Sequence, residues 1–122
     1  MRALIVDDES AIREIYEDFL RSEMAFDEVL NAEDGLDAFL LSQNEKFDII
    51  LIDHMMPFMK GADFLVALRN KIGPNQNTLV IMISAYLPDL SESIKSIQNT
   101  FFMEKPADFE RIKRYLKMVI NS

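Results

Sequence analysis

The sequence predicts an α/β fold in which a doubly wound, parallel sheet of five strands carries helices on both faces. Three observations support this prediction. Short continuous apolar runs recur along the chain, amphipathic segments alternate with them, and turn residues separate the two. Strands that are apolar on both faces are expected where helices cover both sides of a parallel sheet. The alternation of strands with helices favours right-handed crossovers between parallel strands.

The strands are predicted from short runs of apolar residues. Four runs are almost entirely apolar, and they cover residues 3–6, 49–52, 79–83 and 100–103. A weaker strand is predicted at 28–31. Each of the four strong runs is followed closely by a polar or charged residue, which becomes important when the ends of the strands are compared.

The helices are predicted from apolar residues spaced at i, i+3, i+4 and i+7. Three such stripes are formed by Ile12, Ile15, Tyr16, Phe19 and Leu20; by Leu65, Leu68 and Ile72 after Gly61; and by Phe109, Ile112, Leu116, Val119 and Ile120. Asp108 is the expected N-cap of the last helix. Weaker patterns predict helices at 34–42 and 89–98, and turn residues lie at 73–75 and Pro88.

Length and composition are those of one ordinary domain. The 122 residues are 49% apolar and 28% charged, which is normal for a globular protein with its own core. The net charge of -8 disfavours nonspecific binding to nucleic acid, and the absence of cysteine excludes disulfides and thiolate metal sites. The apolar start is too short for a signal peptide, and no apolar run could span a bilayer. We expect one cytoplasmic domain over residues 1–122, with no output domain and no membrane or nucleic-acid partner.

Five polar side chains follow the predicted strands, namely Asp7, Asp8, Asp53, Ser84 and Lys105. Open α/β sheets bind ligands at the carboxyl ends of their strands, so these side chains are expected to meet at one edge. Two carboxylates about 4 Å apart repel by about 4 kcal/mol at an effective dielectric of about 20. Lys105 would offset part of this charge, and a hard divalent cation, Mg²⁺ or alternatively Mn²⁺, would offset more. A phosphoryl group on Asp53 would then contact the metal, Lys105 and Ser84, because aspartate can form an acyl phosphate.

These residues occur in a specific order along the chain: Asp7-Asp8, then Asp53 within the segment 51–57, then Ser84-Ala85, then Lys105-Pro106. In this order the chain resembles the receiver domains of two-component response regulators, chemotaxis regulators among them, over essentially its whole length. The resemblance implies a flavodoxin-like fold with strand order 2-1-3-4-5. It also implies a phosphoacceptor function in a phosphorelay, rather than turnover of a separate substrate.

The resemblance assigns the phosphoryl and metal chemistry to particular positions. Asp53 matches the phosphoacceptor. Asp8, Asp53 and the backbone carbonyl of Met55 match the direct ligands of Mg²⁺, and Asp7 matches the acid that acts through a metal-bound water. Lys105 matches the lysine that contacts the phosphoryl group.

The switch residues and the partners are also implied by the resemblance. Ser84 matches the hydroxyl that senses the phosphoryl group, and Phe102 matches the aromatic position whose ring turns inward on activation. Pro106 matches a proline that often follows a cis peptide bond. The phosphoryl donor would be a sensor histidine kinase or a histidine phosphotransfer protein. An output protein, not identified by the sequence, would read the face made by the fourth helix, fifth strand and fifth helix.

Several positions depart from the family pattern or remain open. Phe58 stands where the family often has glycine, and Asn99 stands where glycine is also common, although Asn tolerates the left-handed conformation. Met55 and Tyr86 occupy positions that influence hydrolysis of the acyl phosphate, and they predict moderately slow self-dephosphorylation. His54, the only histidine, is expected to face solvent. A homodimer could form on the fourth-helix side and last helix, through Ile94, Ile97 and Tyr115, but these residues could equally pack internally.

Two other function classes compete with this interpretation. A phosphatase of the haloacid dehalogenase type also uses an aspartate nucleophile with Mg²⁺, but it normally has a second Asp where this chain has Met55. A protein-interaction module that is not phosphorylated could keep the same fold. The acidic cluster together with Lys105 argues against that second alternative.

Overall fold

The computed structural model describes residues 1–120, with the side chain of Ile120 outside the described residues. Five parallel strands form one sheet in the order β2-β1-β3-β4-β5. The strands are β1 (Arg2–Val6), β2 (Glu28–Ala32), β3 (Ile49–Asp53), β4 (Leu79–Ser84) and β5 (Thr100–Glu104). The predicted fold class and strand order are therefore confirmed, and each strand begins or ends within one residue of its predicted limits.

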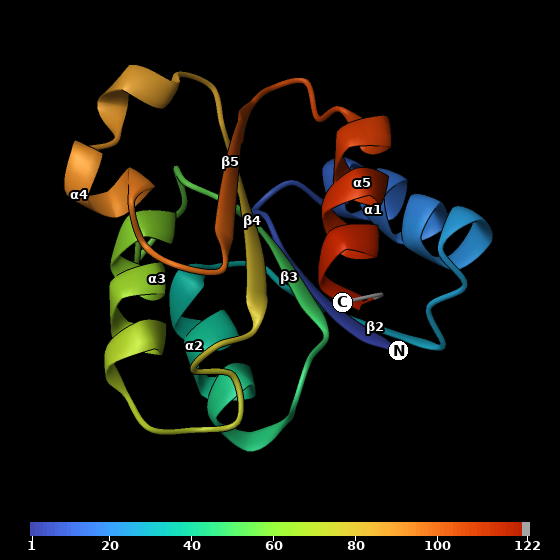
Figure 1. Ribbon diagram of the computed structural model, residues 1–122, viewed down its shortest axis with the longest axis horizontal. Helices are drawn as coiled ribbons and strands as arrows, with labels where there is room; N and C mark the ends of the chain where they lie inside the picture. The colour runs from blue at the N-terminus through green and yellow to red at the C-terminus, as the bar shows by residue number, and fades with distance from the viewer. Residues whose placement is uncertain (121–122) are drawn as a thin grey trace.

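Helices cover both faces of the sheet, as Figure 1 shows. The four longer helices are α1 (Ser10–Glu23), α2 (Gly35–Asn44), α3 (Gly61–Asn70) and α5 (Phe109–Ile120). Helices α1 and α5 lie on one face, and α2 and α3 lie on the other. The side chain of Asp34 caps α2, and Asp108 accepts a hydrogen bond from Arg111 N in the first turn of α5, as expected of an N-cap.

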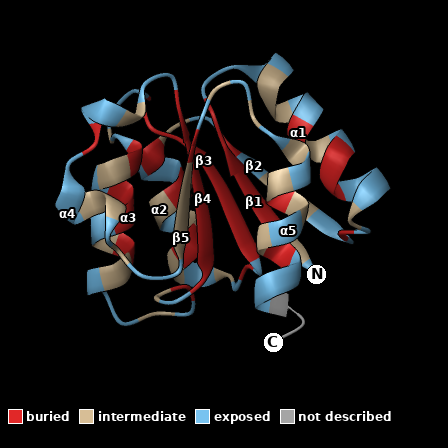
Figure 2. Cartoon of the chain, turned by 45° about the horizontal axis from the view of Figure 1, so that its top comes forward, coloured by how far each residue is buried: buried red, intermediate tan, exposed pale blue. Residues whose placement is uncertain are grey.

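The sheet is buried on both sides, which is why its strands read as continuous apolar runs. All residues of β3 and β4 are buried, and Figure 2 shows the central strands as the buried part of the molecule. Alternate residues of one strand enter two separate cores. Ile49 and Leu51 pack on the side of α1 and α5, whereas Ile50 and Ile52 pack on the side of α2 and α3.

Three residues of the predicted helical stripes do not lie in the core. Ile72 is 91% exposed because α3 ends at Asn70, where the extended backbone of Lys71 begins the turn toward β4. Ile15 is 51% exposed because it lines a groove between α1 and the β5–α5 loop instead of facing the sheet. Val119 is also exposed, close to the end of α5.

The fourth helix is much shorter than the predicted segment 89–98. A 3₁₀ turn, η1 (Leu87–Asp89), contains Pro88, and the α-helix α4 spans only Glu92–Lys95. Between them Leu90 is extended and buried, and Ser91 starts α4 by accepting a hydrogen bond from Ile94 N. A helix is therefore present within the predicted segment, but its predicted extent was wrong, because Asp89 ends the 3₁₀ turn, Leu90 is extended toward the core and α4 ends at Lys95.

The residues that the sequence left open for a homodimer face are at least partly used in internal packing. Ile94 and Ile97 are partly buried against the α2–α3 core. The ring of Tyr115 stacks on Phe101 of β5 with centroids 3.9 Å apart. No helix within residues 1–120 is long and apolar enough to cross a membrane.

Candidate functional site

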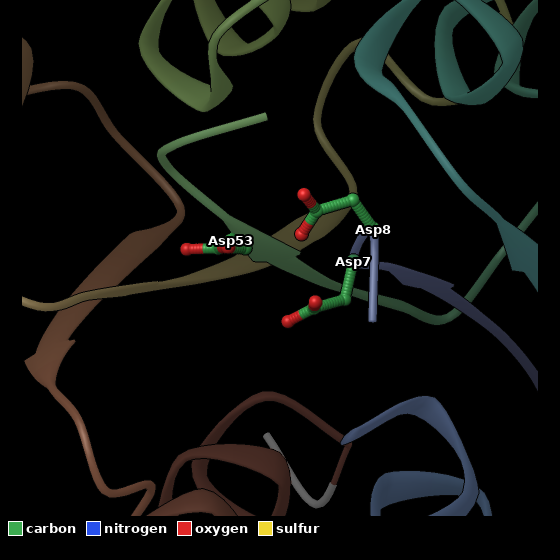
Figure 3. A group of neighbouring side chains, drawn as sticks. All are labelled: Asp7, Asp8 and Asp53. Carbon is green, nitrogen blue, oxygen red and sulfur yellow. The ribbon is translucent and has the colours of Figure 1, made fainter. Parts of the chain in front are cut away.

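Three carboxylates meet at the carboxyl edge of the sheet. Asp7 and Asp8 follow β1, Asp53 ends β3, and carboxylate oxygens of the three lie within 4.8 Å of one another. The register explains this, because Val6 pairs with Ile52 and the next residue on each strand is an aspartate. Figure 3 shows Asp7 and Asp8 beside Asp53, although they come from separate strands. The predicted convergence of these acids is therefore present in the structure.

The acids differ in burial, and burial changes their protonation. Asp7 is 1% exposed and Asp53 is 7% exposed, whereas Asp8 is exposed. Burial raises the pKa of Asp7 to about 6, and the nearby charge of Asp53 adds to the rise, while a hydrogen bond from Glu9 N opposes it. Burial also raises the pKa of Asp53, and the principal opposing influence is Lys105. The two buried acids thus carry their negative charge at a cost.

Lys105 supplies the positive charge that the sequence predicted. Its Nζ lies 3.3 Å from Oδ2 of Asp53, and its backbone N–H donates to the carbonyl of Ser84 at 2.8 Å. The bond to Ser84 holds the start of the β5–α5 loop against the end of β4. The peptide bond between Lys105 and Pro106 is cis. A hydrogen bond from Met55 N–H also lowers the pKa of Asp53, so two donors favour its ionised form.

Ser84 and Phe102 lie on the neighbouring strands β4 and β5. Ser84 is buried at the end of β4, next to the β3 end that carries Asp53. Among the described residues its hydroxyl has only long contacts, at 3.4 Å to Tyr86 O and 3.3 Å from Tyr86 N in its own loop. Phe102 pairs with Met82 and packs, partly buried, against the α2–α3 core rather than among the carboxylates. The side chain of Met55 is exposed in the loop after Asp53.

The donor set fits a hard divalent cation. Oδ1 of Asp7 accepts a hydrogen bond from Glu9 N at 2.9 Å, whereas Oδ2 is the one buried side-chain oxygen without a partner in the described part of the chain. Buried carboxylate oxygens normally have a partner. An orphan oxygen beside two further carboxylates matches the oxygen ligands that Mg²⁺ prefers.

His54 is buried, so the expectation that it faces solvent was wrong. It is 7% exposed, and its Nδ1 accepts a hydrogen bond from Ala62 N at 3.2 Å. Burial and, to a smaller extent, the charge of Lys60 lower the pKa of its imidazole. The sequence carried no signal for this contact, because it depends on how closely the start of α3 approaches the end of β3.

The glycine at the start of α3 allows that close approach. A Cβ on Gly61 would lie 2.8 Å from the carbonyl oxygen of Asp53 and 2.9 Å from Cα of His54. These distances are shorter than van der Waals contact, so only glycine fits without a backbone shift. In the loop before α3, Phe58 has a left-handed φ of 68°. Asn99, in the separate segment before β5, has a left-handed φ of 57°. The predicted tolerance of Asn for this conformation is confirmed, whereas Phe58 adopts it without that advantage.

Comparison with known protein sequences agrees with the resemblance to receiver domains. The family model of the response regulator receiver domain matches residues 3–117. The chain is 34% identical over 110 residues to protein-glutamate methylesterase/protein-glutamine glutaminase of Methanococcus maripaludis, a match that covers 88% of this chain and 29% of the relative. It is 39% identical over 69 residues to chemotaxis protein CheY-3 of Vibrio cholerae, covering 57% of this chain and 52% of that protein.

Solved structures share the fold. The receiver domain of a sensor histidine kinase from Pseudomonas aeruginosa, described with a magnesium ion coordinated in its active site cleft, has a TM-score of 0.84 and 22% identity. That match covers 99% of this chain and 98% of the other. The chain spans only 29% to 52% of the length of the two curated relatives named above.

Proposed function

This chain belongs to the response regulator receiver family, and from that membership we propose that it receives a phosphoryl group on Asp53. Receiver domains are the phosphoacceptor modules of two-component phosphorelays. The observation that carries the assignment to Asp53 is its position. It is the only one of the three clustered acids that also contacts Lys105 within residues 1–120, at 3.3 Å. A carboxylate held between an ammonium and two further acids suits the formation of an acyl phosphate.

The transfer step follows from the atoms present. An oxygen of Asp53 attacks the phosphorus of a phosphohistidine on the partner, the P–N bond breaks, and the imidazole nitrogen leaves with the electron pair and takes up a proton. Lys105 stabilises negative charge on the phosphoryl oxygens, because phosphoryl transfer depends mostly on position and charge neutralisation. We assign Asp8, Asp53 and the carbonyl of Met55 as direct ligands of Mg²⁺ or Mn²⁺, and Asp7 as a ligand through water. The bound cation would offset charge on the acids and on the phosphoryl oxygens.

The same site would also control the conformational change that follows phosphorylation. The hydroxyl of Ser84 has only long local contacts, so it can turn toward a phosphoryl group at little cost. Movement of Ser84 would leave room for the ring of Phe102 to turn inward. Phosphorylation would then shift the population toward a second packing of α4, β5 and α5. An output protein, or a second copy of this chain, would recognise that packing, and the donor would be a sensor histidine kinase or phosphotransfer protein.

This assignment makes the chain a signalling domain in the cytoplasm rather than an enzyme with a separate substrate. A phosphatase of the haloacid dehalogenase type is disfavoured because it needs a second aspartate two residues after the nucleophile. In this chain Met55 occupies that position, and its side chain is exposed. The unphosphorylated interaction module is disfavoured by the orphan oxygen of Asp7 and the ion pair of Lys105.

Labelling with radioactive acetyl phosphate in Mg²⁺ buffer tests the function. Wild-type protein should be labelled, Asp53→Asn should not, and Asp18→Asn, which changes an exposed acid on α1, should be labelled normally. The label should be an acyl phosphate that decays slowly, since Met55 and Tyr86 offer little to orient water. Label that persists in Asp53→Asn would refute the acceptor, and a lifetime of seconds would refute the slow decay.

A further inference from the structure

The buried histidine next to the phosphoacceptor has an unusual set of contacts. The backbone N–H of His54 donates to Ile83 O at 3.2 Å, and its carbonyl accepts from Gly61 N at 2.8 Å. Its Nδ1 accepts from Ala62 N at 3.2 Å. One residue is thus bonded both to β4 and to the first turn of α3. The mechanism proposed above gives its side chain no chemical role.

The side-chain bond replaces a capping interaction that α3 lacks locally. Lys60 is the N-cap of α3 and, within the described residues, its side chain caps nothing. By contrast, Asp34 caps α2 and Ser91 caps α4 through their own side chains. An N-cap side chain normally accepts from the second or third helical N–H, and Ala62 is the second residue of α3. The imidazole of His54 therefore supplies the cap from the preceding strand.

The chemistry of this bond fixes the form of the imidazole. A nitrogen that accepts a hydrogen bond carries no proton, so the proton of the neutral ring is on Nε2. Asn has an amide oxygen at nearly the same distance from the backbone as Nδ1. Leu has the same shape as Asn but no acceptor. These two residues can therefore separate the hydrogen bond from the volume of the side chain.

The loop that this cap closes carries the proposed metal-binding backbone. Residues 55–60 connect Asp53 to α3, and much of the loop is exposed, including Met55 and Phe58. Phe58 holds a left-handed φ of 68° with its side chain 87% exposed, so the loop is not fixed by packing of that ring. The bond from Gly61 N–H holds its far end against the backbone of His54, and the bond from Ala62 N–H holds it against the imidazole.

We propose that His54 is a positioning residue of the phosphoacceptor site, whose Nδ1 caps α3 and so holds the Asp53–α3 loop in the cation-binding arrangement. The inference rests on the proposed function of Asp53. Without the acceptor, the loop samples open arrangements that must be closed when Mg²⁺ binds. The apparent affinity then falls by the fraction of molecules in the closed arrangement.

The test compares His54→Leu with His54→Asn. In His54→Leu the amide of Ala62 should lose protection from hydrogen exchange, and the dissociation constant for Mg²⁺ by calorimetry should rise about fivefold, equivalent to about 1 kcal/mol. Labelling by acetyl phosphate at limiting Mg²⁺ should slow by a similar factor. His54→Asn should restore all three measurements toward wild type. Each variant is measured at a temperature where circular dichroism shows it to be folded.

Each outcome decides the proposal. If His54→Leu binds Mg²⁺ as wild type does, or if Leu and Asn impair it equally, the acceptor has no positioning role. If His54→Leu does not fold, His54→Gln is used instead, because its amide lies one bond farther out and should not replace Nδ1. If wild-type protein binds Mg²⁺ but is never labelled, the proposed function fails, and the Mg²⁺ affinities of the variants still decide the role of His54.

Discussion

The ammonium of Lys105 lies 3.3 Å from Oδ2 of Asp53, and this is the one ion pair within residues 1–120 whose carboxylate is buried. All the other ion pairs among these residues involve carboxylates that are at least partly exposed, and such pairs contribute little to stability. The buried pair is different because burial raises the pKa of Asp53 and Lys105 opposes that rise. Its position at the end of β3 indicates a role in charge control at the site.

Replacement of Lys105 should impair phosphorylation. In Lys105→Met we expect the rate of labelling by acetyl phosphate to fall on the order of a hundredfold, because one fixed positive charge beside the reacting oxygens is lost. Lys113→Met removes a lysine that pairs with Glu23 and Glu110 on the molecular surface, and it should label normally. Equal rates for the two variants would mean that Lys105 takes no part in the transfer.

Asp7 should make the metal-free protein less stable as the pH rises. Its pKa is about 6 in the folded protein, against an ordinary value of 3.8 for an aspartate, so the folded state binds more protons between these two pH values. Stability therefore falls as the pH rises through this window, and the loss is complete above about pH 6. Asp7→Asn should be more stable than wild type at pH 8 by about 1–3 kcal/mol, and the difference should vanish near about pH 3.5.

Urea denaturation in a chelating buffer at several pH values measures this difference. Asp8→Asn serves as a control because that acid is exposed. Saturating Mg²⁺ should reverse the order, since the cation stabilises wild type by binding the ionised acids. A difference between wild type and Asp7→Asn that does not change from pH 4 to pH 8 would contradict the assigned pKa.

The convergence of the acids could be predicted because it follows from local patterns and a simple topology. Asp7 and Asp53 each follow a buried strand, and parallel neighbours in register bring the next residues together. Ser84 and Lys105 follow from the same rule on β4 and β5. The strands depend on runs of apolar residues, which are visible in the sequence, whereas their order was implied by the resemblance to receiver domains.

The burial of His54 and the length of α4 could not be predicted in the same way. His54 is buried because α3 begins against the backbone of Asp53, a contact between segments that no periodicity records. The α4 region divides because Leu90 turns into the core between two short turns. Both features depend on tertiary packing and local side-chain hydrogen bonds, and neither changes the apolar pattern.

Gly61→Ala should damage the site although it changes a single methyl group. The added Cβ would lie 2.8 Å from the carbonyl oxygen of Asp53, so the start of α3 must move away from the acid. We expect a loss of about 1–3 kcal/mol in the free energy of unfolding and a weaker affinity for Mg²⁺. Urea denaturation and calorimetry measure the two effects.

Gly73→Ala is the matched control for this substitution. Its Cβ would lie 3.3 Å from the end of the flexible Gln43 side chain and 4.0 Å, an ordinary contact, from the carbonyl oxygen of Lys71, and Gly73 lies in the turn before β4. We expect its free energy of unfolding to stay within about 1 kcal/mol of wild type. If both variants lose the same stability, the close approach at Gly61 is not the cause.

Arg69 connects the end of α3 to the starts of β4 and β5. Its guanidinium donates to five acceptors, which are Gln98 O at 3.2 Å, Gln76 O at 3.0 Å, Thr78 O at 2.8 Å, Asn99 O at 2.9 Å and Thr100 Oγ1 at 3.2 Å. Burial lowers its pKa to about 10, and none of these acceptors is a carboxylate. The positive charge of Arg69 is therefore stabilised by hydrogen bonds to neutral acceptors, and these acceptors in turn receive hydrogen bonds from the guanidinium.

Arg69→Met should destabilise the protein by about 2–4 kcal/mol in urea denaturation, because it removes the guanidinium donor from the partly buried carbonyls of Gln76 and Thr78. Arg69→Lys should lie between wild type and Met, since an ammonium has three donors and cannot reach all five acceptors. Arg21→Met is the control. Arg21 is an arginine that bonds one carboxylate and one carbonyl, but it lies exposed on α1, so its loss should cost less than about 1 kcal/mol.

Loss of Arg69 should also speed hydrogen exchange at Val80. The N–H of Val80 donates at 3.0 Å to the carbonyl of Asn99, and Arg69 donates to the same carbonyl. Equal stability of Arg69→Met and Arg21→Met would show that water replaces the guanidinium at these carbonyls.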